Sequence, residues 1–439
     1  MSFGSNIRIL LYGGDTMLAR AVQLILPVQA PGEEFIKDKW PAWSYLFRSL
    51  EWEVTWSDLH GQPHYSPEML HEIEQYRKEN ESGTRLWGDT LSFQMEHPPD
   101  LRILNLETAV TRTIDSRDQP RKLLRYHLHV DNIGPVFNRF SEQRYGGNQV
   151  VPYIVSLANN HSMDFGRKAF HLESLPMLNA LPGDGTLIGA GRNFRQASAP
   201  FTRTINGVPI QVYAFTTLCA GTWRRWSATS YRSGVSTLPA LTSQRRIAKA
   251  LRQVSSCMVR HRNPNAIRIL SIHWGPNWAT ENDHQDLRQI FAHRLIDELG
   301  FDLIYGHSTH HIRGLERYKG KLIVYGAGDL INDYESYIAT TLPRYNHDGG
   351  IFVVDLDRIS GILNDLRVLP LQIKKLQLRT LEAERAAQLA SAINDHSCSD
   401  CVIRSPHARP LLLSQEQYHA KLDVPSEGVH SVLRMNRED

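Results

Sequence analysis

The stretch that decides the fold is IRILLYGGDTM, residues 7–17, where an apolar run of strand length ends in two glycines and an aspartate. Similar runs recur at 101–107, 151–158, 209–216, 266–274, 301–307, 321–328 and 350–357. Near-continuous apolar runs, rather than strict alternation, are typical of strands buried on both faces. Helical patterns at 166–180, 243–261 and 284–299 separate some of them. The sequence therefore predicts an α/β fold with a largely parallel sheet.

Two long stretches interrupt this alternation. Residues 28–100 are rich in Pro, Trp, Tyr, Glu and His, with helical periodicity only around 67–80, and we interpret them as an insertion after the first strand that covers one edge of the site. Residues 218–240 form a second polar, aromatic loop, and long loops in compact domains usually serve function. After about residue 372 the pattern is helical over 376–394 and then polar. We expect a main domain over 1–372 and a C-terminal helical and irregular extension over 373–439.

Composition and charge narrow the function classes. The 439 residues carry a net charge of only +3, from 49 basic and 46 acidic side chains, which gives no electrostatic argument for a nucleic-acid partner. No apolar stretch reaches the roughly 18 residues that a membrane helix needs. The N-terminus lacks the basic and apolar regions of a signal peptide, so we expect a cytoplasmic protein. The CxxC at Cys398 and Cys401 has no second pair and is interpreted as two reduced thiols. The oligomeric state stays open.

Polar side chains follow several of the strands at the point where each strand ends. The endings are Asp15, Asn105 with Glu107, Asn160 with His161, His273, and His307 with His310. In open α/β sheets ligands bind at the carboxyl ends of the strands. Imidazoles suit transition metals, and carboxylate or amide oxygens suit Mg²⁺, Mn²⁺ or Ca²⁺. One such ending is more often a turn residue, but five in the same sense favour a divalent metal site.

The motifs at these endings resemble a known family. GGDTMLAR, ILNLETAVT, SLANNHSMDFG, SIHWGPNW and GHSTHHIRGLERYKGKLIVYGAGDLINDYE are similar, in order and spacing, to the motifs of the CapA/PgsA proteins of poly-γ-glutamate capsule biosynthesis. The resemblance covers about residues 7–370. It implies a calcineurin-like metallophosphatase fold, which is a two-sheet α/β sandwich flanked by helices with a metal centre between the sheets.

The resemblance also implies roles for individual residues. It suggests Asp15, Glu107, Asn160, His273 and His307 as metal ligands, for a divalent ion that can be Mn, Mg, Ca, Zn or Fe. It suggests His161, Asp164 and His310 as catalytic residues, with turn formation as the competing role for Asp164. Met17 stands where metallophosphatases often have a histidine, and a thioether is a poor ligand for a hard cation. This departure argues against the usual dinuclear site.

Several further residues are candidates for substrate binding. They are Arg20, Asn105, Arg125, His311, Arg313 and Asp333. A guanidinium pairs with a carboxylate through two parallel hydrogen bonds, which suits a substrate with carboxylates. Trp223, Trp226 and Tyr231, with Arg224 and Arg225, can form an aromatic, basic rim for a peptide. Surface exposure of the arginines and core packing of the tryptophans are the competing interpretations.

Three functions are compatible with these features. The first is a soluble metal-dependent enzyme, hydrolase-like, that acts on a peptide or polyglutamate-type substrate and has an accessory or tailoring role in polyglutamate or peptide natural-product biosynthesis. The family's capsule members are membrane-anchored, and this chain shows no anchor, which favours the accessory role. The second is a metal-dependent peptide epimerase that uses His/Asp acid–base pairs. The third is a non-catalytic binding scaffold.

Overall fold

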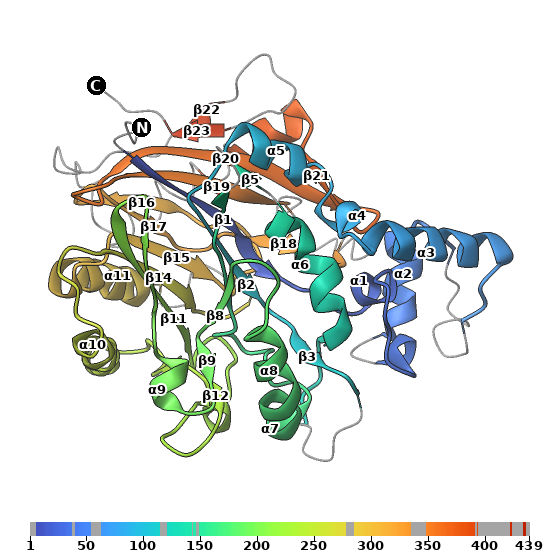
Figure 1. Ribbon diagram of the computed structural model, residues 1–439, viewed down its shortest axis with the longest axis horizontal. Helices are drawn as coiled ribbons and strands as arrows, with labels where there is room; N and C mark the ends of the chain where they lie inside the picture. The colour runs from blue at the N-terminus through green and yellow to red at the C-terminus, as the bar shows by residue number, and fades with distance from the viewer. Residues whose placement is uncertain are drawn as a thin grey trace, which may run out of the picture.

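Two β-sheets lie face to face in the computed structural model, with helices on both outer sides (Figure 1). The structure describes residues 6–36, 40–53, 63–114, 121–142, 144–145, 149–277, 285–334, 348–390, 393, 422–423 and 433–435. The two-sheet α/β sandwich flanked by helices that the sequence predicted is confirmed.

The first sheet is mixed. Its order is β22 (Leu422–Asp423), β23 (Leu433–Met435), β20 (Leu363–Lys374), β19 (Asp348–Asp357), β1 (Asn6–Thr16), β2 (Leu101–Leu106), β7 (Tyr153–Ser156) and β8 (Gly185–Ile188), with β18 (Asp329–Ile331) beside β1 and β21 (Gln377–Thr380) beside β20. β1, β2, β7, β8 and β18 pair in parallel, whereas β19 and β20 are antiparallel. The expectation of a largely parallel sheet therefore holds for only half of this sheet.

The second sheet is parallel along its centre. Its order is β10 (Phe201–Ile205), β11 (Val208–Thr217), β14 (Ile267–His273), β15 (Leu303–His307), β17 (Lys321–Val324) and β16 (Leu315–Tyr318), with β13 (Thr237–Leu238) beside β11. Three small strand pairs complete the set: β3 (Ala109–Thr111) with β4 (His127–His129), β5 (Arg144–Tyr145) with β6 (Gln149–Val150), and β9 (Ala190–Gly191) with β12 (Gly234–Val235).

The apolar runs are near-continuous because the central strands are buried on both faces. In β1, Ile7, Ile9 and Leu11 pack against the second sheet, in one cluster with residues such as Ile269. Leu10 and Tyr12 point the other way, into a core shared with helices. A third core lies between the second sheet and α10 and α11. The layers are therefore helices, first sheet, second sheet, helices.

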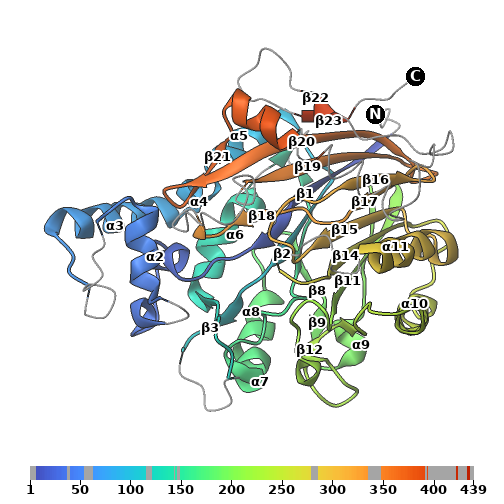
Figure 2. The same cartoon turned by 180° about the vertical axis from the view of Figure 1, so that it is seen from behind.

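The helices form two groups (Figures 1 and 2). Those on the side of the first sheet are α1 (Ala21–Leu24), α2 (Ala42–Ser49), α3 (Pro67–Asn80), α4 (Thr84–Trp87), α5 (Thr90–Glu96), α6 (Ile133–Glu142), α7 (Gly166–Ala169) and α8 (Leu175–Leu178). The others are α9 (Phe194–Ala197), α10 (Gln244–Val259) and α11 (Gln285–Leu299), of which α10 and α11 cover the second sheet. Within the described ranges, no helix is long and apolar enough to cross a bilayer.

The insertion between β1 and β2 is more helical than its sequence indicated. The predicted helix near 67–80 is α3, which begins after Ser66, whose hydroxyl accepts a hydrogen bond from the Met69 amide at 3.2 Å. The short helices α2, α4 and α5 were not predicted. They pack through aromatic residues such as Trp43 and Trp87, which are fully buried in the core of the first sheet.

The region after residue 372 also differs from the expectation. The helix predicted over 376–394 starts too early, because Gln377–Thr380 forms β21, and the helix occupies 383–390. Arg385 on this helix pairs with Asp348 at the start of β19, which fixes the helix to the first sheet. The CxxC at Cys398 and Cys401 lies outside the described residues.

Candidate metal centre

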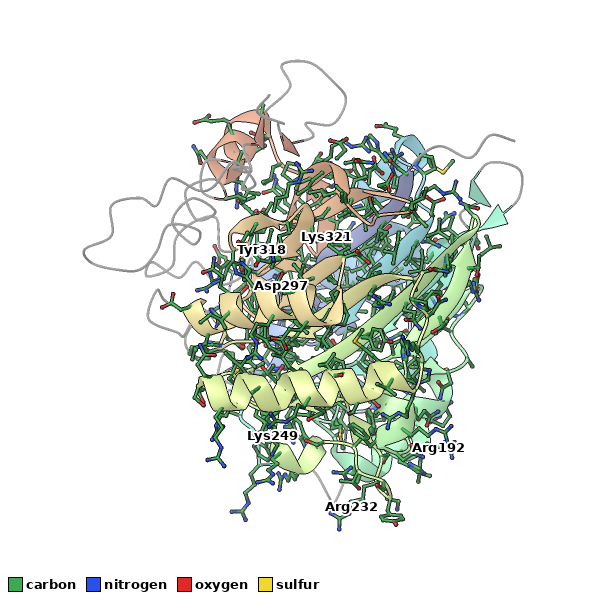
Figure 3. All side chains as sticks on the ribbon, turned by 90° about the vertical axis from the view of Figure 1, so that its left-hand side faces the viewer. Arg192, Arg232, Lys249, Asp297, Tyr318 and Lys321 are labelled. Carbon is green, nitrogen blue, oxygen red and sulfur yellow. The ribbon has the colours of Figure 1, made fainter. Side chains whose placement is uncertain are left out.

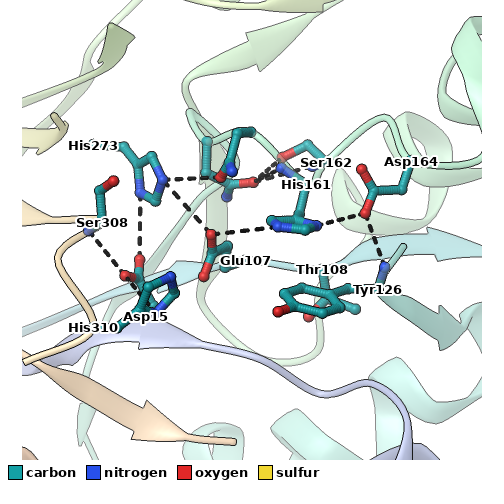
Figure 4. A network of polar contacts seen from close by, with 12 residues as sticks. Asp15, Glu107, Thr108, Tyr126, His161, Ser162, Asp164, His273, Ser308 and His310 are labelled. Atoms are coloured by element: carbon teal, nitrogen blue, oxygen red, sulfur yellow. Dashed lines mark hydrogen bonds and ion pairs between the residues drawn. The ribbon is translucent and has the colours of Figure 1, made fainter. Parts of the chain in front are cut away.

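Strand register brings the predicted ligands to one edge of the sandwich. Asp15 in β1 lies opposite Asn105 in β2 and Asp329 in β18. In the second sheet, His273 in β14 lies opposite His307 in β15. Because these strands are parallel, their carboxyl ends meet at the same edge, and donors from the two sheets converge (Figure 4).

Asp15, His273 and His307 form one possible ligand triplet. Their donor atoms lie within 4.8 Å of one another, and all three residues are buried. His273 Nδ1 is 3.3 Å from Asp15 Oδ1, and its Nε2 is 3.0 Å from the side-chain oxygen of Asn160. Burial alone would raise the pKa of Asp15, but the neighbouring histidines hold it well below its usual range. Burial lowers the pKa of His307 to about 3. Asp15, His273 and His307 thus lie close to one another, and Asn160 joins them through its contact with His273.

Glu107, the fifth predicted ligand, lies between His273 and His161 (Figure 4). It is completely buried, and neither carboxylate oxygen has a hydrogen-bond partner among the described residues. Its Oε1 is 3.7 Å from His273 Nε2 and 3.9 Å from His161 Nε2. Burial and the nearby Asp15 raise the pKa of Glu107 well above its usual range. A buried carboxylate in this situation is costly unless a proton or a cation neutralises it, so the residues present fit a bound divalent metal.

A second possible triplet shares Asp15. It consists of Asp15, His310 and Asp329, again with donor atoms within 4.8 Å of one another. His310 Nδ1 is 2.9 Å from Asp329 Oδ1. Burial would lower the pKa of His310, but Asp329, Glu107 and Asp15 raise it to about 10.

The turn that carries His310 is conformationally unusual. Ser308 and His310 have positive φ angles of 97° and 60°, in a backbone region that residues other than glycine rarely adopt. The Ser308 amide donates a hydrogen bond to Asp15 Oδ2 at 2.9 Å. This contact and the His310–Asp329 pair hold the strained turn against the metal centre.

His161 and Asp164 form a pair on the other side of Glu107. His161 Nδ1 is 2.6 Å from Asp164 Oδ2, and the Tyr126 ring stacks on the imidazole at a centroid distance of 3.9 Å. Asp164 also accepts a hydrogen bond from the Tyr126 amide at 2.8 Å. Asp164 therefore orients His161, in addition to lying in the turn before α7. Burial lowers the pKa of His161 to about 4, against the effect of Asp164.

Lys122 is a site residue that the sequence analysis missed. Its Nζ is 2.9 Å from Asp164 Oδ1, 3.0 Å from His161 Nδ1 and 2.8 Å from the Asn160 carbonyl oxygen. Burial lowers the pKa of Lys122, and Asp164 opposes that effect. Lys122 lies in a polar stretch without periodicity, so no local pattern marked it as a site residue. Asp329 was also left out of the ligand set, although the strand ending GAGD carried it.

The predicted substrate-binding residues lie in different situations. Arg20 and Asp333 form a buried ion pair, and the Arg20 guanidinium lies 4.1 Å from the centroid of the Tyr45 ring. Asn105 donates a hydrogen bond to Asp15 at 2.8 Å and accepts one from Asn159. These three residues hold the framework of the site together, and their role in substrate binding stays a prediction.

The other three predicted substrate-binding residues flank the centre. His311 is buried, and its Nδ1 lies 2.7 Å from the Thr309 carbonyl oxygen. Arg313 is buried next to Gly326. Arg125 is half-buried and directly precedes Tyr126. Their contact with a substrate stays a prediction.

Met17 belongs to neither ligand triplet. It packs with Ala19 and Tyr126 in a small apolar cluster, and its sulfur accepts a hydrogen bond from the Ala19 amide at 3.2 Å. Met17 therefore does not act as a ligand in place of the histidine that metallophosphatases often have at this position. His310, with Asp329, supplies the second triplet from the opposite side of Asp15.

The loop 218–226 forms one wall of the centre. Gly221 lies against Asn160, so that a Cβ at this position would be 3.1 Å from the Asn160 amide nitrogen. Trp223 and Trp226 stack at a centroid distance of 5.3 Å, and the Trp226 ring faces Lys122. Trp226 is buried in the core of the first sheet and Trp223 packs against that core, which favours the competing interpretation of core packing, while Tyr231 is exposed.

Comparison with solved structures finds distant similarities. A crystal structure of a novel phosphatase from Mycoplasma pneumoniae aligns with a TM-score of 0.37 and 9% identity, covering 84% of this chain and 94% of that chain. GAP50, the anchor in the inner membrane complex of Plasmodium, aligns with a TM-score of 0.33 and 11% identity, covering 69% and 87%.

Sequence comparison finds closer relatives. A Mycobacterium tuberculosis protein named "probable polyglutamine synthesis accessory protein" is 29% identical over 381 residues, which are 86% of this chain and 88% of the relative. The capsule biosynthesis protein CapA of Bacillus anthracis is 26% identical over 209 residues, 46% of each chain. Residues 9–334 match the family described as "Bacterial capsule synthesis protein PGA_cap". This match spans the strands and ligands described above, and the chain belongs to that family of bacterial capsule synthesis proteins.

Proposed function

We propose that the chain is a metal-dependent, hydrolase-like enzyme that acts on a peptide or polyglutamate-type substrate, in an accessory or tailoring role. The observation that carries the proposal is Glu107, a fully buried carboxylate without a hydrogen-bond partner among the described residues, placed between imidazoles. A protein that only needed to fold would gain stability from an apolar side chain at such a position. A cation that is bound by several such donors explains why the carboxylate is there.

The donor atoms of the candidate centre indicate which cations suit it. Asp15, Glu107, Asn160, His273 and His307 would hold the first cation, and His310 with Asp329 would complete a site for a second beside Asp15. The mixture of imidazoles and carboxylates favours Zn, Mn or Fe over Mg or Ca, which prefer oxygen donors throughout. When bound, a divalent cation lowers the pKa of coordinated water and polarises a substrate oxygen.

His161 is the residue placed to move a proton. Its Nδ1 faces Asp164 at 2.6 Å, so Nδ1 keeps its hydrogen and donates it to that carboxylate. Nε2 consequently has a free lone pair, and it faces Glu107 and the ligand cluster (Figure 4). In hydrolysis of an amide, Nε2 of His161 would take a proton from the attacking water and then pass this proton to the leaving nitrogen.

Epimerisation is a second candidate because two imidazole–carboxylate pairs face the centre. His161 pairs with Asp164 and His310 pairs with Asp329, and Glu107 lies near both pairs. Inversion at a Cα needs one base to remove the proton and a second acid to return a proton to the opposite face. Deuterium uptake at Cα without loss of chain length separates this reaction from hydrolysis.

Elemental analysis together with two variants tests the proposal. Wild-type protein should retain a transition metal after purification, Asp15→Ala should lose it, and His161→Ala should keep most of it. Incubation with γ-linked oligoglutamate, followed by mass spectrometry, should show cleavage by the wild type and none by His161→Ala. If both variants match the wild type in metal content and turnover, the site is assigned wrongly. A wild-type protein without metal and without turnover would support the binding-scaffold alternative.

A further inference from the structure

A basic cavity of about 710 Å³ lies beside the candidate metal centre, between the loop 218–226 and α10. Its lining includes five cationic side chains: Arg224, Arg245, Arg246, Lys249 and Arg252. No aspartate or glutamate lines it. The whole chain has a net charge of only +3, so these five charges are a local concentration and not a reflection of general composition.

These cations are not neutralised by neighbouring side chains. None of the five forms an ion pair with a residue in the described part of the chain, and all five are exposed. Cations around α11 are arranged differently: Arg294 pairs with Glu298, Lys319 with Asp297 and Lys321 with Asp302. Figure 3 shows Lys249 on the outer side of α10, away from Asp297 and Lys321. The basic cavity therefore concentrates positive charges that no acidic side chain in the described part of the chain neutralises.

The placement of these charges is unfavourable for α10 itself. Ile247, Ala250, Leu251 and Val254 form the buried face of the helix. Arg245, Lys249 and Arg252 follow each other at spacings of four and three residues, so like charges are neighbours on the exposed face. The first turn carries basic residues and no acidic one, although the helix dipole favours negative charge there. An anionic ligand would relieve both effects.

The basic cavity and the candidate metal centre share a wall. Leu218 and Arg224 line the basic cavity, while Gly221, between them in sequence, lies against Asn160. Leu238 and Pro239 add an apolar surface to the basic cavity. A chain lying in the basic cavity would thus have apolar contacts along its length and would be one loop away from the ligand cluster.

We propose that the basic cavity binds a carboxylate-rich peptide chain, with glutamate side chains paired to the arginines of α10, and that it holds this chain beside the metal centre. Arginine pairs with carboxylates through two parallel hydrogen bonds, and the apolar wall suits the methylene groups of glutamate. A neutral glutamine chain would gain nothing from five cations. The identification of the ligand as a peptide rests on the proposed function, whereas its negative charge rests on the basic cavity alone.

Binding of a labelled γ-linked decaglutamate, followed by fluorescence anisotropy, tests the inference. Wild-type protein should bind it, and a matched decaglutamine should not compete. The triple variant Arg246→Ser, Lys249→Ser, Arg252→Ser should bind at least tenfold more weakly, because its exposed positions leave the fold unchanged. Arg192→Ser removes a cation on the same side of the molecule outside the basic cavity (Figure 3), and should change the affinity less than twofold.

Two further measurements separate this inference from the proposed function. Asp15→Ala protein should lose its metal and still bind decaglutamate, so a failure of the metal proposal leaves the binding result intact. Equal affinity of the wild type and the triple variant, at equal metal content and melting temperature, would overturn the inference. Displacement of decaglutamate by oligothymidylate at a lower concentration than by unlabelled decaglutamate would also overturn it, in favour of a nucleic-acid site.

Discussion

Glu107 combines complete burial with carboxylate oxygens that face imidazoles instead of amide or hydroxyl donors. Glu107 should therefore lower the free energy of unfolding of the metal-free protein and raise that of the proposed metal-bound protein. A metal at 100 times its dissociation constant adds about 2.7 kcal/mol to the free energy of unfolding. Under the proposed function, Glu107 would connect the stability of the fold to the occupancy of the site.

The first prediction concerns Glu107→Gln. The variant should be at least as stable as the wild type in the presence of a chelator, because the charge burial is removed. Addition of metal should stabilise it by less than half of the roughly 2–3 kcal/mol expected for the wild type. Urea unfolding with and without chelator measures both quantities. Glu316→Gln is the control, since Glu316 bonds to Tyr325 and His293 away from the centre and its change should not depend on metal.

The second prediction concerns Lys122→Met. Lys122 contacts both Asp164 and His161. Its replacement removes a hydrogen-bond partner of each, so Asp164 and His161 should no longer be held in their present positions. Turnover should fall about 10–100-fold, as is usual for groups that orient an active residue, while metal content stays unchanged. Because the positive charge of Lys122 lowers the pKa of His161, nitrogen NMR of the ring should show protonation of His161 at a higher pH than in the wild type. Lys78→Met, at an exposed position on α3, should alter neither readout.

At the residue scale, sequence patterns identified the groups that end strands. Asp15, Glu107, Asn160, His273 and His307 are brought together as expected, because each follows an apolar run. Lys122 could not be found in this way, since its partners Asp164 and His161 lie about 40 residues on, and no local pattern encodes that contact. Arg20 and Asp333 show the same limit: the pairing partner of each is 313 residues away.

At the element scale, close contact between β1 and β18 positions Asp329 beside Asp15. A Cβ on Gly14 would lie 2.2 Å from the carbonyl oxygen of Gly328, so only glycine permits this approach. The Asp15 amide in turn donates a hydrogen bond to the same oxygen at 3.1 Å. The second ligand triplet therefore depends on a backbone contact.

The third prediction compares two glycines. Gly14→Ala should displace β18, lower the free energy of unfolding by about 1–3 kcal/mol and reduce the amount of bound metal. Gly134→Ala, in α6 with nothing within 4 Å of the added methyl, should raise the free energy of unfolding by about 0.5–1 kcal/mol. Denaturant titration and elemental analysis measure the two effects. A Gly14→Ala protein with full stability and metal content would contradict the role given to this contact.

Elements with long apolar runs were predictable, and elements held by tertiary contacts were not. Each of the eight apolar runs contains a strand. β20 (Leu363–Lys374) was missed because polar residues and Pro370 interrupt its short apolar run, and β21 was taken as helix. The short helices α2, α4 and α5 have too few turns for periodicity to show, and burial of residues such as Trp87 fixes them instead.

At the scale of the whole molecule, the relative position of the two sheets sets the geometry of the centre. Asp15, Glu107 and Asn160 come from the first sheet, and His273, His307 and His310 from the second. Tyr305 in β15 crosses the space between the sheets, and its hydroxyl donates a hydrogen bond to the carbonyl oxygen of Gly13, two residues before Asp15. This contact links the ligands of one sheet to those of the other.

The fourth prediction concerns Tyr305→Phe, which removes that link without touching a ligand. The free energy of unfolding should fall by about 1–2 kcal/mol, because a buried carbonyl loses its donor. Metal affinity should weaken severalfold as the two ligand sets gain freedom, which isothermal titration with Zn²⁺ or Mn²⁺ can measure. Tyr213→Phe, whose hydroxyl bonds at 3.4 Å to Gln211 and whose ring packs against the helices of the second sheet, should leave metal affinity unchanged.

The pairing of Asp15 with Asp329 has a consequence for the order of events during synthesis. Donors of the candidate centre are distributed from the first strand to a strand more than 300 residues later. A growing polypeptide on the ribosome therefore lacks a complete ion site until nearly the whole sandwich has emerged. An ion cannot nucleate the folding of such a protein as it nucleates a zinc finger. Metal binding should therefore follow the assembly of both sheets and stabilise the folded protein.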